Sequence, residues 1–277
     1  MDRSRLSLMT FPMDIDLENK TMSIRDIFEL ARQAGIPYVD VMNVREVQLP
    51  EYRMAMQETG VRVYAYITVI SFLEDGIRPD CAILEQLKIA KQLGAEFLMI
   101  VPYGYTDWDR ASVLGSAEVK RRMIEGFRTA VELARPFGVR VCFETTPHDA
   151  SCLSGTQDCL DVLTAVDGLE FVFDTANMLP HGDDPLEAYE TLKDRISHVH
   201  LKDVVLKPWS NVSVYSEHTP DSRLMWCVVW GEGIIPVHEI YRRMIADGYA
   251  GHFAIEYVHP EGSCGLQRHM DQLNRFL

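Results

Sequence analysis

The stretch ISHVHLKD, residues 196–203, combines the pattern of a buried β-strand with two histidines at alternate positions. In a strand, residues i and i+2 point to the same face, so His198 and His200 share one side while Val199 and Leu201 face the other. A buried imidazole needs a hydrogen-bond partner or a metal ion, because an unpaired polar group is costly to bury. The rest of the chain must therefore supply partners for two histidines.

Strand-like apolar runs on both sides of this stretch alternate with segments that have helical spacing of apolar residues. The expected strands are residues 6–11, 38–42, 61–67, 97–101, 139–144, 171–174, 196–201 and 252–257. The expected helices are residues 24–34, 50–59, 80–93, 119–134, 157–166, 186–193, 236 onward and 266–276. A connector from Lys202 to Ile235 separates the seventh strand from the seventh helix.

The strict alternation of strand and helix predicts a parallel sheet with right-handed crossovers. Eight such repeats are what a closed (β/α)8 TIM barrel requires. A doubly wound open sheet is the alternative, but it leaves two strands to explain. Because no linker or low-complexity segment is visible, we expect residues 1–277 to form a single TIM-barrel domain.

The composition is that of an ordinary globular protein, with 277 residues, 47% hydrophobic residues and 25% charged residues. No apolar run is long enough to span a membrane, and the N-terminus lacks the pattern of a signal peptide, so we expect a cytoplasmic protein without a membrane partner. The six cysteines form no C-x-x-C pair and are expected to be reduced. The net charge of −14 disfavours nucleic acid as a partner, since an acidic surface repels phosphates.

Four neighbouring strands end in residues that commonly bind metal ions. The runs VCFE, FVFD, HVH and FAIE end at Glu144, Asp174, His200 and Glu256, respectively. In each run, the parity that turns this last residue inward also turns the bulky apolar residues toward the helices. Because the chemistry of a TIM barrel lies at the carboxyl ends of its strands, we expect these four side chains to meet at one barrel mouth.

Three carboxylates at one mouth repel one another strongly unless a cation lies between them. Three oxygen ligands and one imidazole are a ligand set that suits Mn²⁺, Mg²⁺ or Co²⁺. A structural Zn²⁺ ion would instead favour thiolate ligands. We therefore expect one divalent metal ion, Mn²⁺ first, with Mg²⁺, Co²⁺ or Zn²⁺ as alternatives. Each residue alone has a simpler interpretation, and Asp174 before Thr-Ala-Asn also fits a plain turn.

The motifs ETTP at Glu144, FDTAN at Asp174, HVHLKD around His200, GEG at residues 231–233 and AIEY at Glu256 resemble those of the xylose-isomerase-like TIM-barrel superfamily. Its members include sugar isomerases, tagatose 3-epimerase-like enzymes and inosose dehydratases. The resemblance covers essentially the whole chain. It implies that Glu144, Asp174, His200 and Glu256 hold one divalent ion.

The same resemblance implies a metal-dependent sugar isomerase or epimerase as the first hypothesis. The cation polarises the carbonyl of a keto- or aldo-sugar and stabilises an enediolate, while Glu144 and Glu256 remove and return a proton. The alternative is a lyase or dehydratase acting on a keto-sugar, an inosose or a 3-keto-glycoside at the same site. A small sugar or polyol is the expected partner, and a homo-oligomer is possible because the superfamily often forms one.

Two positions depart from the pattern of the epimerases. Asn177 stands where they usually have a histidine that touches the substrate, and Ala150 stands where they often have a glutamate. His148 is the best replacement acid or base, and a relocated acid favours lyase chemistry; a solvated loop histidine is the simpler alternative.

Four residues are predicted to contact the substrate: Asn177, Lys202, Tyr105 and Trp108. Aromatic rings on barrel loops stack on sugars, although they also cover the barrel or pack against a neighbouring subunit. Lys202 fits a substrate carboxylate or phosphate, but an ordinary salt bridge is the better interpretation of a single cation.

Two further hypotheses have less support. A nuclease similar to the family-IV apurinic endonucleases shares the barrel, but needs a larger histidine-rich zinc set and a basic groove. A non-catalytic sugar sensor has no need of two opposed glutamates such as Glu144 and Glu256.

Overall fold

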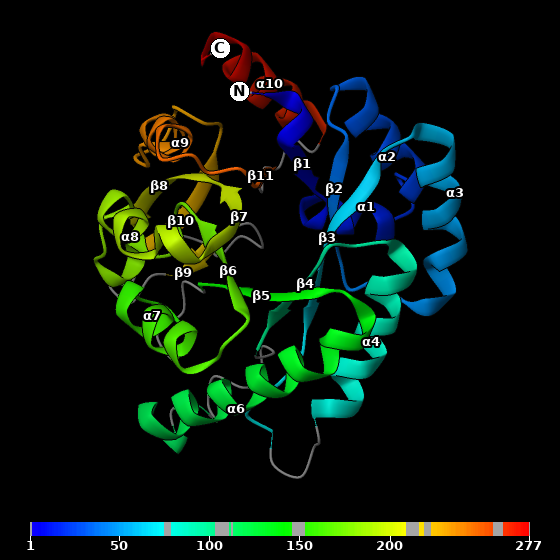
Figure 1. The fold of residues 1–277 in the computed structure, drawn as a ribbon. Helices are drawn as coiled ribbons and strands as arrows, with labels where there is room; N and C mark the ends of the chain where they lie inside the picture. Colours follow the sequence, from blue (N-terminus) through cyan, green and yellow to red (C-terminus); the bar gives the residue numbers. More distant parts are fainter. Residues whose placement is uncertain are drawn as a thin grey trace.

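The structure is a computed structural model of the chain, and it describes residues 2–74, 79–102, 111, 113–145, 153–208, 216–218, 223–256 and 263–276. Helices surround a ring of strands, as Figure 1 shows. The two ends of the chain lie side by side, where Nη2 of Arg3 donates to Oδ1 of Asn274 at 2.7 Å.

The ring of strands is a closed parallel barrel, which confirms the predicted TIM-barrel fold. Its strands follow the order β1-β11-β7-β6-β5-β4-β3-β2, and each pairs in parallel with its neighbours. Their bounds are β1 (Leu6–Met9), β2 (Tyr38–Met42), β3 (Arg62–Val69), β4 (Phe97–Val101), β5 (Arg140–Glu144), β6 (Leu169–Asp174), β7 (Ile196–Leu201) and β11 (His252–Ile255).

The helices follow the strands in the predicted alternation. Their bounds are α1 (Asp14–Glu18), α2 (Ile24–Gln33), α3 (Leu49–Thr59), α4 (Pro79–Leu93), α6 (Ser116–Ala134), α7 (Thr156–Ala165), α8 (Pro185–Leu192), α9 (Val237–Ala246) and α10 (Ser263–Phe276). Helix α2 begins where the sequence predicts it, because Ser23 and Asp26 form a capping box. Pro236 caps α9 rather than starting it, and the first strand stops at Met9 because a 3-10 turn, Phe11–Met13, follows.

Two apolar layers hold the barrel in shape. One fills the barrel interior and contains Met9, Tyr64, Ala65, Ile67, Phe97, Met99, Cys142 and Val172. The other lies between the strands and the helices and includes Phe143, Phe171, Phe173, Val199 and Phe253. The predicted parity is therefore confirmed, because the bulky residues of β5, β6, β7 and β11 face the helices.

The predicted connector between Lys202 and Ile235 contains a small sheet that the sequence reading missed. It is antiparallel, in the order β8 (Asp203–Pro208), β10 (Arg223–Val228) and β9 (Ser216–His218). Asp203 anchors its base, because its carboxylate accepts N–H groups of Val204, Gly231, Gly233 and Ile235 at 2.8–3.0 Å. This contact holds the GEG motif against the end of β7.

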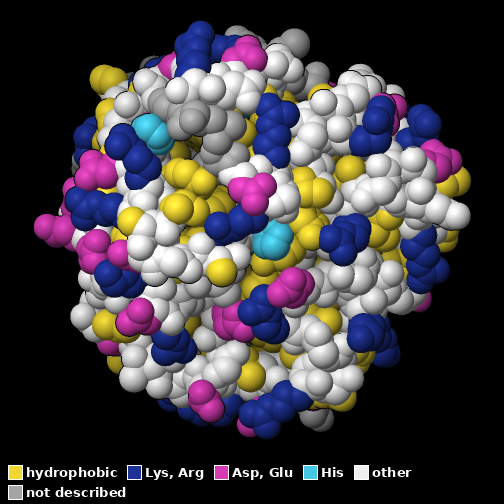
Figure 2. Space-filling view, turned by 45° about the horizontal axis from the view of Figure 1, so that its top comes forward, with side chains coloured by type: hydrophobic (Ala, Val, Ile, Leu, Met, Phe, Trp, Pro, Cys, Tyr) yellow, Lys and Arg dark blue, Asp and Glu magenta, His cyan; other side chains and the backbone are white. Residues whose placement is uncertain are grey.

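The surface carries charges of both signs. On the face drawn in Figure 2, Lys and Arg side chains alternate with Asp and Glu side chains and with apolar patches, and neither sign gathers into one large patch. Among the helices that the structure describes, none is long and apolar enough to cross a membrane.

Candidate metal centre and active site

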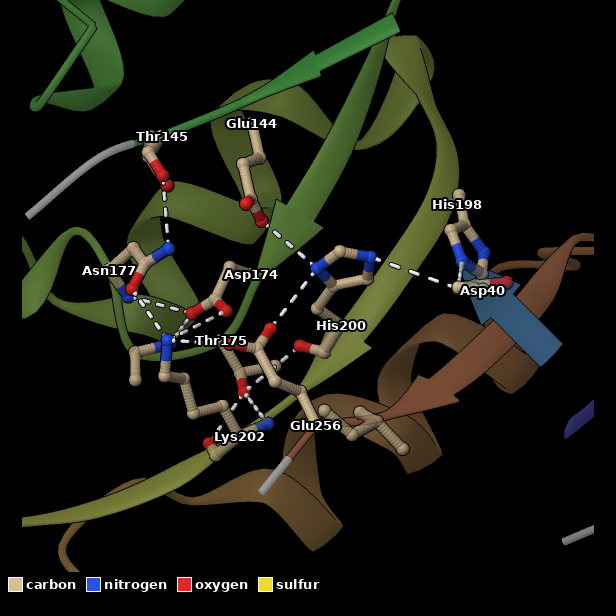
Figure 3. Close-up of polar contacts among 12 residues, drawn as sticks. Asp40, Glu144, Thr145, Asp174, Thr175, Asn177, His198, His200, Lys202 and Glu256 are labelled. Atoms are coloured by element: carbon tan, nitrogen blue, oxygen red, sulfur yellow. Dashed lines mark hydrogen bonds and ion pairs between the residues drawn. The ribbon is translucent and has the colours of Figure 1, made fainter. Parts of the chain in front are cut away.

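The four predicted ligands meet at the carboxyl end of the barrel. Glu144 ends β5, Asp174 ends β6, His200 lies near the end of β7, and Glu256 follows β11 directly. Each offers one ligand atom, and these atoms all lie within 4.8 Å of one another. Figure 3 shows the three carboxylates and the imidazole turned toward one another. Four residues at the ends of different strands, more than one hundred positions apart from first to last, therefore form one compact cluster.

His200 lies at the centre of this cluster and presents Nδ1 to two of the carboxylates. Its Nδ1 lies 2.9 Å from Oε2 of Glu144 and 3.1 Å from Oε2 of Glu256. The imidazole is fully buried, whereas 14% of the Glu144 side chain is exposed. Of the two glutamates, Glu144 is therefore the more accessible to a small molecule.

Asp174 uses its two carboxylate oxygens differently. Oδ1 accepts the backbone N–H groups of Ala176 and Asn177 at 2.7 and 2.8 Å, which is the turn that the sequence suggested as an alternative. Oδ2 points into the cluster and makes no hydrogen bond within the described residues. The turn thus fixes the carboxylate so that its second oxygen remains available as a ligand.

The cluster fits a divalent cation. Within the described ranges, Nδ1 of His200 faces Oε2 of Glu144 and Oε2 of Glu256, and Oδ2 of Asp174 makes no hydrogen bond. Buried polar atoms are normally hydrogen-bonded, so four buried ligand atoms with no hydrogen-bond partner outside their own cluster among the described residues require an explanation. Three carboxylate oxygens and one imidazole nitrogen are ligands that Mn²⁺, Mg²⁺, Co²⁺ and Zn²⁺ accept.

Lys202 lies among the same groups. Its Nζ is 2.9 Å from Oε1 of Glu256, 3.6 Å from Oδ2 of Asp174 and 3.1 Å from Oδ1 of Asn177, and the side chain is almost fully buried. The interpretation of Lys202 as an ion-pair residue is confirmed. The pair is buried beside the cluster, where an ion pair is far less screened by water than on the surface.

The electrostatics of the cluster depend on burial and on close charges. Burial raises the pKa of Asp174 well above its usual range, and the nearby carboxylates add to this effect while Lys202 opposes it. Burial alone would lower the pKa of His200, but the carboxylates of Glu144 and Glu256 raise it well above 6.5. Burial would raise the pKa of Glu256, but Lys202 and His200 lower it far below the usual range. Without a metal ion, the cluster therefore favours a protonated imidazole.

His198 lies deeper in the barrel, on the same side of β7 as His200. Its Nε2 lies 2.7 Å from Oδ2 of Asp40, and its Nδ1 lies 3.1 Å from the carbonyl oxygen of His252. The prediction of a hydrogen-bonded histidine is confirmed for this residue. Its partner Asp40 was not found from the sequence, although a single carboxylate at an inward position of the apolar run YVDVM on β2 was a usable signal.

The predicted substrate contacts are only partly placed. Both polar ends of the Asn177 amide touch the protein, since Nδ2 donates to the carbonyl of Thr145 at 3.0 Å and Oδ1 accepts from Lys202. Trp230 of the connector is buried, and its Nε1 donates to the carbonyl of Leu201 at the end of β7. The remaining predicted residues, His148, Tyr105 and Trp108, lie outside the described residues.

The geometry agrees with comparisons to known proteins. Residues 28–275 match the sequence profile of the xylose isomerase-like TIM barrel family. The chain belongs to this family. A curated relative, inosose dehydratase from Lacticaseibacillus casei, is 26% identical over 141 residues, which are 49% of this chain and 46% of the relative. The aligned part thus spans about half the length of that enzyme.

Three solved structures have the same fold, and each superposes on this chain over almost the full length of both proteins. The probable 3-DHS dehydratase AsbF from Bacillus anthracis has a TM-score of 0.74 at 18% identity, over 98% of each chain. The IOLI protein with a zinc atom has a TM-score of 0.74 at 16% identity, over 98% of this chain and 97% of that one. D-psicose 3-epimerase from Clostridium cellulolyticum has a TM-score of 0.72 at 14% identity, over 98% of each chain. At these identities the likeness shows the fold.

Proposed function

We propose that this chain is a divalent-metal-dependent enzyme that removes a proton from the carbon beside the carbonyl group of a keto-sugar, an inosose or a related compound. Glu144, Asp174, His200 and Glu256 would hold the ion, with Mn²⁺ first and Mg²⁺, Co²⁺ or Zn²⁺ as alternatives. When bound, such an ion acts as a Lewis acid toward the substrate carbonyl. The observation that carries the proposal is the set of four buried ligand atoms at the barrel mouth, which lie within 4.8 Å of one another and have no hydrogen-bond partner outside the cluster among the described residues.

Glu144 is the proposed base. It is the more exposed of the two glutamates, and within the described ranges its one charge contact is with the imidazole of His200. Glu256 is in contact with both His200 and Lys202, and this pairing favours its ionised but strongly stabilised form. Both glutamates face His200, but only Glu256 also contacts an ammonium group, and a second cation makes a carboxylate a weaker base, so we assign proton removal to Glu144.

This asymmetry favours dehydration as the outcome. Glu144 takes the proton, the electron pair of the broken C–H bond forms the new double bond, and the bond to the β-hydroxyl group breaks. That group leaves as water with a proton from an acid of the site, the role predicted for His148. Lys202 is the donor placed to bind that hydroxyl group, because Asn177 and Glu256 hold its ammonium at the site. The name of the curated relative, inosose dehydratase, supports the same reaction class. His148 stays a predicted auxiliary acid.

Isomerase or epimerase activity, the first hypothesis from the sequence, is the second candidate. It is favoured by a different observation, namely that Oε2 of Glu144 and Oε2 of Glu256 approach the same ring nitrogen from separate strands. Two opposed carboxylates can remove a proton on one face and return it on the other. The epimerase among the structural neighbours has this fold.

One experiment separates these outcomes. The purified protein, loaded with Mn²⁺, is incubated in deuterated water with a panel of ketoses, inososes and 3-keto-glycosides. We expect loss of water and an unsaturated product from at least one compound. Deuterium at carbon without loss of water would instead establish the isomerase or epimerase alternative. If no compound exchanges or reacts, while the chain binds the metal, the proposed proton abstraction is wrong.

A further inference from the structure

Asp40 on β2 reaches across the barrel interior to the histidines of β7. The carboxylate is fully buried, as are both histidines. Oδ2 accepts from Oγ of Ser7 at 3.1 Å and lies 2.7 Å from Nε2 of His198, while Oδ1 accepts the N–H of Ala65 at 3.3 Å. Three contacts from three different strands therefore fix this carboxylate.

The ring of His198 is fixed at both nitrogens. Nδ1 faces the carbonyl oxygen of His252, which only accepts hydrogen bonds, so Nδ1 carries a proton. Nε2 then shares a proton with Asp40. The ring of His198 stands perpendicular to that of His200, with centroids 5.3 Å apart. His198 thus packs edge-to-face with the imidazole in the candidate metal centre.

The two nitrogens of His200 face different groups. Nδ1 faces Glu144 and Glu256, whereas Nε2 faces Oδ2 of Asp40 at 3.9 Å. That distance is too long for a formed hydrogen bond, so Asp40 acts on Nε2 through its charge. A nearby negative charge favours the tautomer with a proton on Nε2, which leaves the lone pair of Nδ1 for a metal ion.

We propose that Asp40, held by Ser7 and His198, is a positioning residue that keeps His200 in the ring orientation and the Nε2–H tautomer that metal binding requires. This inference rests on the proposed function, because it assumes that His200 is a ligand. Asp40, His198 and His200 also satisfy the spacing of a three-ligand metal site. The alternative of a second ion at these residues is an outcome of the test.

The test compares metal binding by the wild type, Asp40→Asn and Ser7→Ala. Asparagine keeps the shape of the side chain and an acceptor for Ala65 but removes the charge. Titration of the metal-free proteins with Mn²⁺ in a calorimeter should show one ion per wild-type chain. We expect Asp40→Asn to weaken binding by about ten- to hundredfold, the range for partners of metal-bound histidines. Ser7→Ala keeps the charge of Asp40 and its contacts with His198 and Ala65, so it should weaken Mn²⁺ binding far less than Asp40→Asn does.

A second measurement on the wild type keeps the inference testable if Asp40→Asn does not fold. With ¹⁵N-labelled histidine and Zn²⁺, the NMR spectrum should show His200 protonated at Nε2 and coordinated through Nδ1. Wild-type affinity in a folded Asp40→Asn protein, or coordination through Nε2, would overturn the inference. So would two ions per wild-type chain, one of which Asp40→Asn loses. If the wild type binds no metal, the proposed function itself fails.

Discussion

The Nζ atom of Lys202 lies 2.9 Å from Oε1 of Glu256, so a cation of the protein itself already touches the candidate metal centre. The same Nζ is 3.6 Å from Oδ2 of Asp174. Lys202 therefore has two opposing effects. It stabilises the buried carboxylates when no metal is bound, and it would repel a divalent ion held by them.

Replacing Lys202 by methionine should separate these effects. In the metal-free protein, Lys202→Met should lower the free energy of unfolding by about 3–5 kcal/mol, the cost of breaking a buried ion pair. Its affinity for Mn²⁺ should rise, because the like charge is gone. Thermal unfolding with EDTA and with saturating Mn²⁺ measures both changes. The exposed Lys88 on α4 gives a control, Lys88→Met, and an equal effect of both substitutions would contradict the assignment.

Substitutions of Glu144 and Glu256 should affect proton exchange and product formation differently. With saturating Mn²⁺, Glu144→Gln should slow deuterium exchange at the substrate carbon by about 10²–10⁴-fold, since the proposed base is gone. Glu256→Gln should lose product formation yet keep measurable exchange, since Glu144 remains. NMR of the substrate in deuterated water follows both processes. Equal loss of exchange in the two variants would favour a mechanism that uses both glutamates as bases.

The two oxygens of Asp174 predict different results for two substitutions. Asp174→Asn keeps an acceptor for the N–H groups of Ala176 and Asn177 but loses the charge. Loss of a residue that only hydrogen-bonds to a metal ligand weakens metal binding by about ten- to hundredfold, and loss of this proposed ligand should weaken Mn²⁺ binding by at least that much. The metal-free protein should remain as stable as the wild type.

Asp174→Ala also leaves the two buried N–H groups without this acceptor. It should lower the free energy of unfolding by about 1–3 kcal/mol in addition to losing metal affinity. Urea denaturation compares the two variants. If both are equally stable, the turn does not depend on Oδ1.

Much of the candidate site was predictable because it depends on local sequence. The parity of a strand decides which side chains point inward, and the barrel places every strand end at one mouth, so VCFE and FVFD were enough to place Glu144 and Asp174. The contact of Asp40 with His198 was not predictable, because it joins residues 158 positions apart across the closed barrel. The sequence likewise shows Lys202 only as a single cation, because its partners Asp174 and Glu256 are distant in the sequence.

The small sheet of β8, β9 and β10 was missed for a different reason. It begins one residue after β7, with only Lys202 between the two strands, so no glycine or proline marks the change of direction. Its third strand is only three residues long. Its geometry depends on Asp203, which binds N–H groups nearly thirty residues further along the chain.

The metal-free protein should lose stability as the pH rises above neutrality. The folded protein holds the pKa values of His200 and Asp174 above their ordinary values of 6.5 and 3.8. A group whose pKa is raised by folding stabilises the folded protein fully at pH values below its pKa in the unfolded chain. This stabilisation is lost as the pH rises through its pKa in the folded protein. Each such group contributes a slope of up to about 1.4 kcal/mol per pH unit.

The window from about pH 7 to 8.5 isolates this effect. His238 and His252 have lowered pKa values, so they change the stability only below about pH 6.5. Burial raises the pKa of Asp14 to about 6, which also lies below the window. Glu256 has a lowered pKa, so its contribution is constant in this window. Urea denaturation in EDTA should therefore show decreasing stability. Saturating Mn²⁺ should remove the decrease, because the ion binds the deprotonated ligands. A flat or rising curve in EDTA contradicts the assigned shifts.

Gly233, in the GEG motif, should tolerate no side chain. A Cβ at this position would lie 2.1 Å from Oδ1 of Asp203 and 2.5 Å from the carbonyl oxygen of Val204. Gly233→Ala must therefore displace the carboxylate that gathers four N–H groups, and we expect it to lower the free energy of unfolding by about 1–3 kcal/mol. Gly155→Ala is the matched control, because its Cβ would meet only Oδ2 of Asp183 at an ordinary 3.6 Å.

The same substitution should also affect the candidate metal centre, through the backbone that joins Asp203 to Lys202. Asp203 follows Lys202 directly, so moving the Asp203 carboxylate also moves the residue that holds Glu256. Gly233→Ala should therefore weaken Mn²⁺ binding or catalysis even at temperatures where the protein is folded, whereas Gly155→Ala should leave both unchanged. Calorimetric titration and thermal unfolding of the two variants measure this. If Gly233→Ala loses only stability, Asp203 supports the small sheet without positioning Lys202.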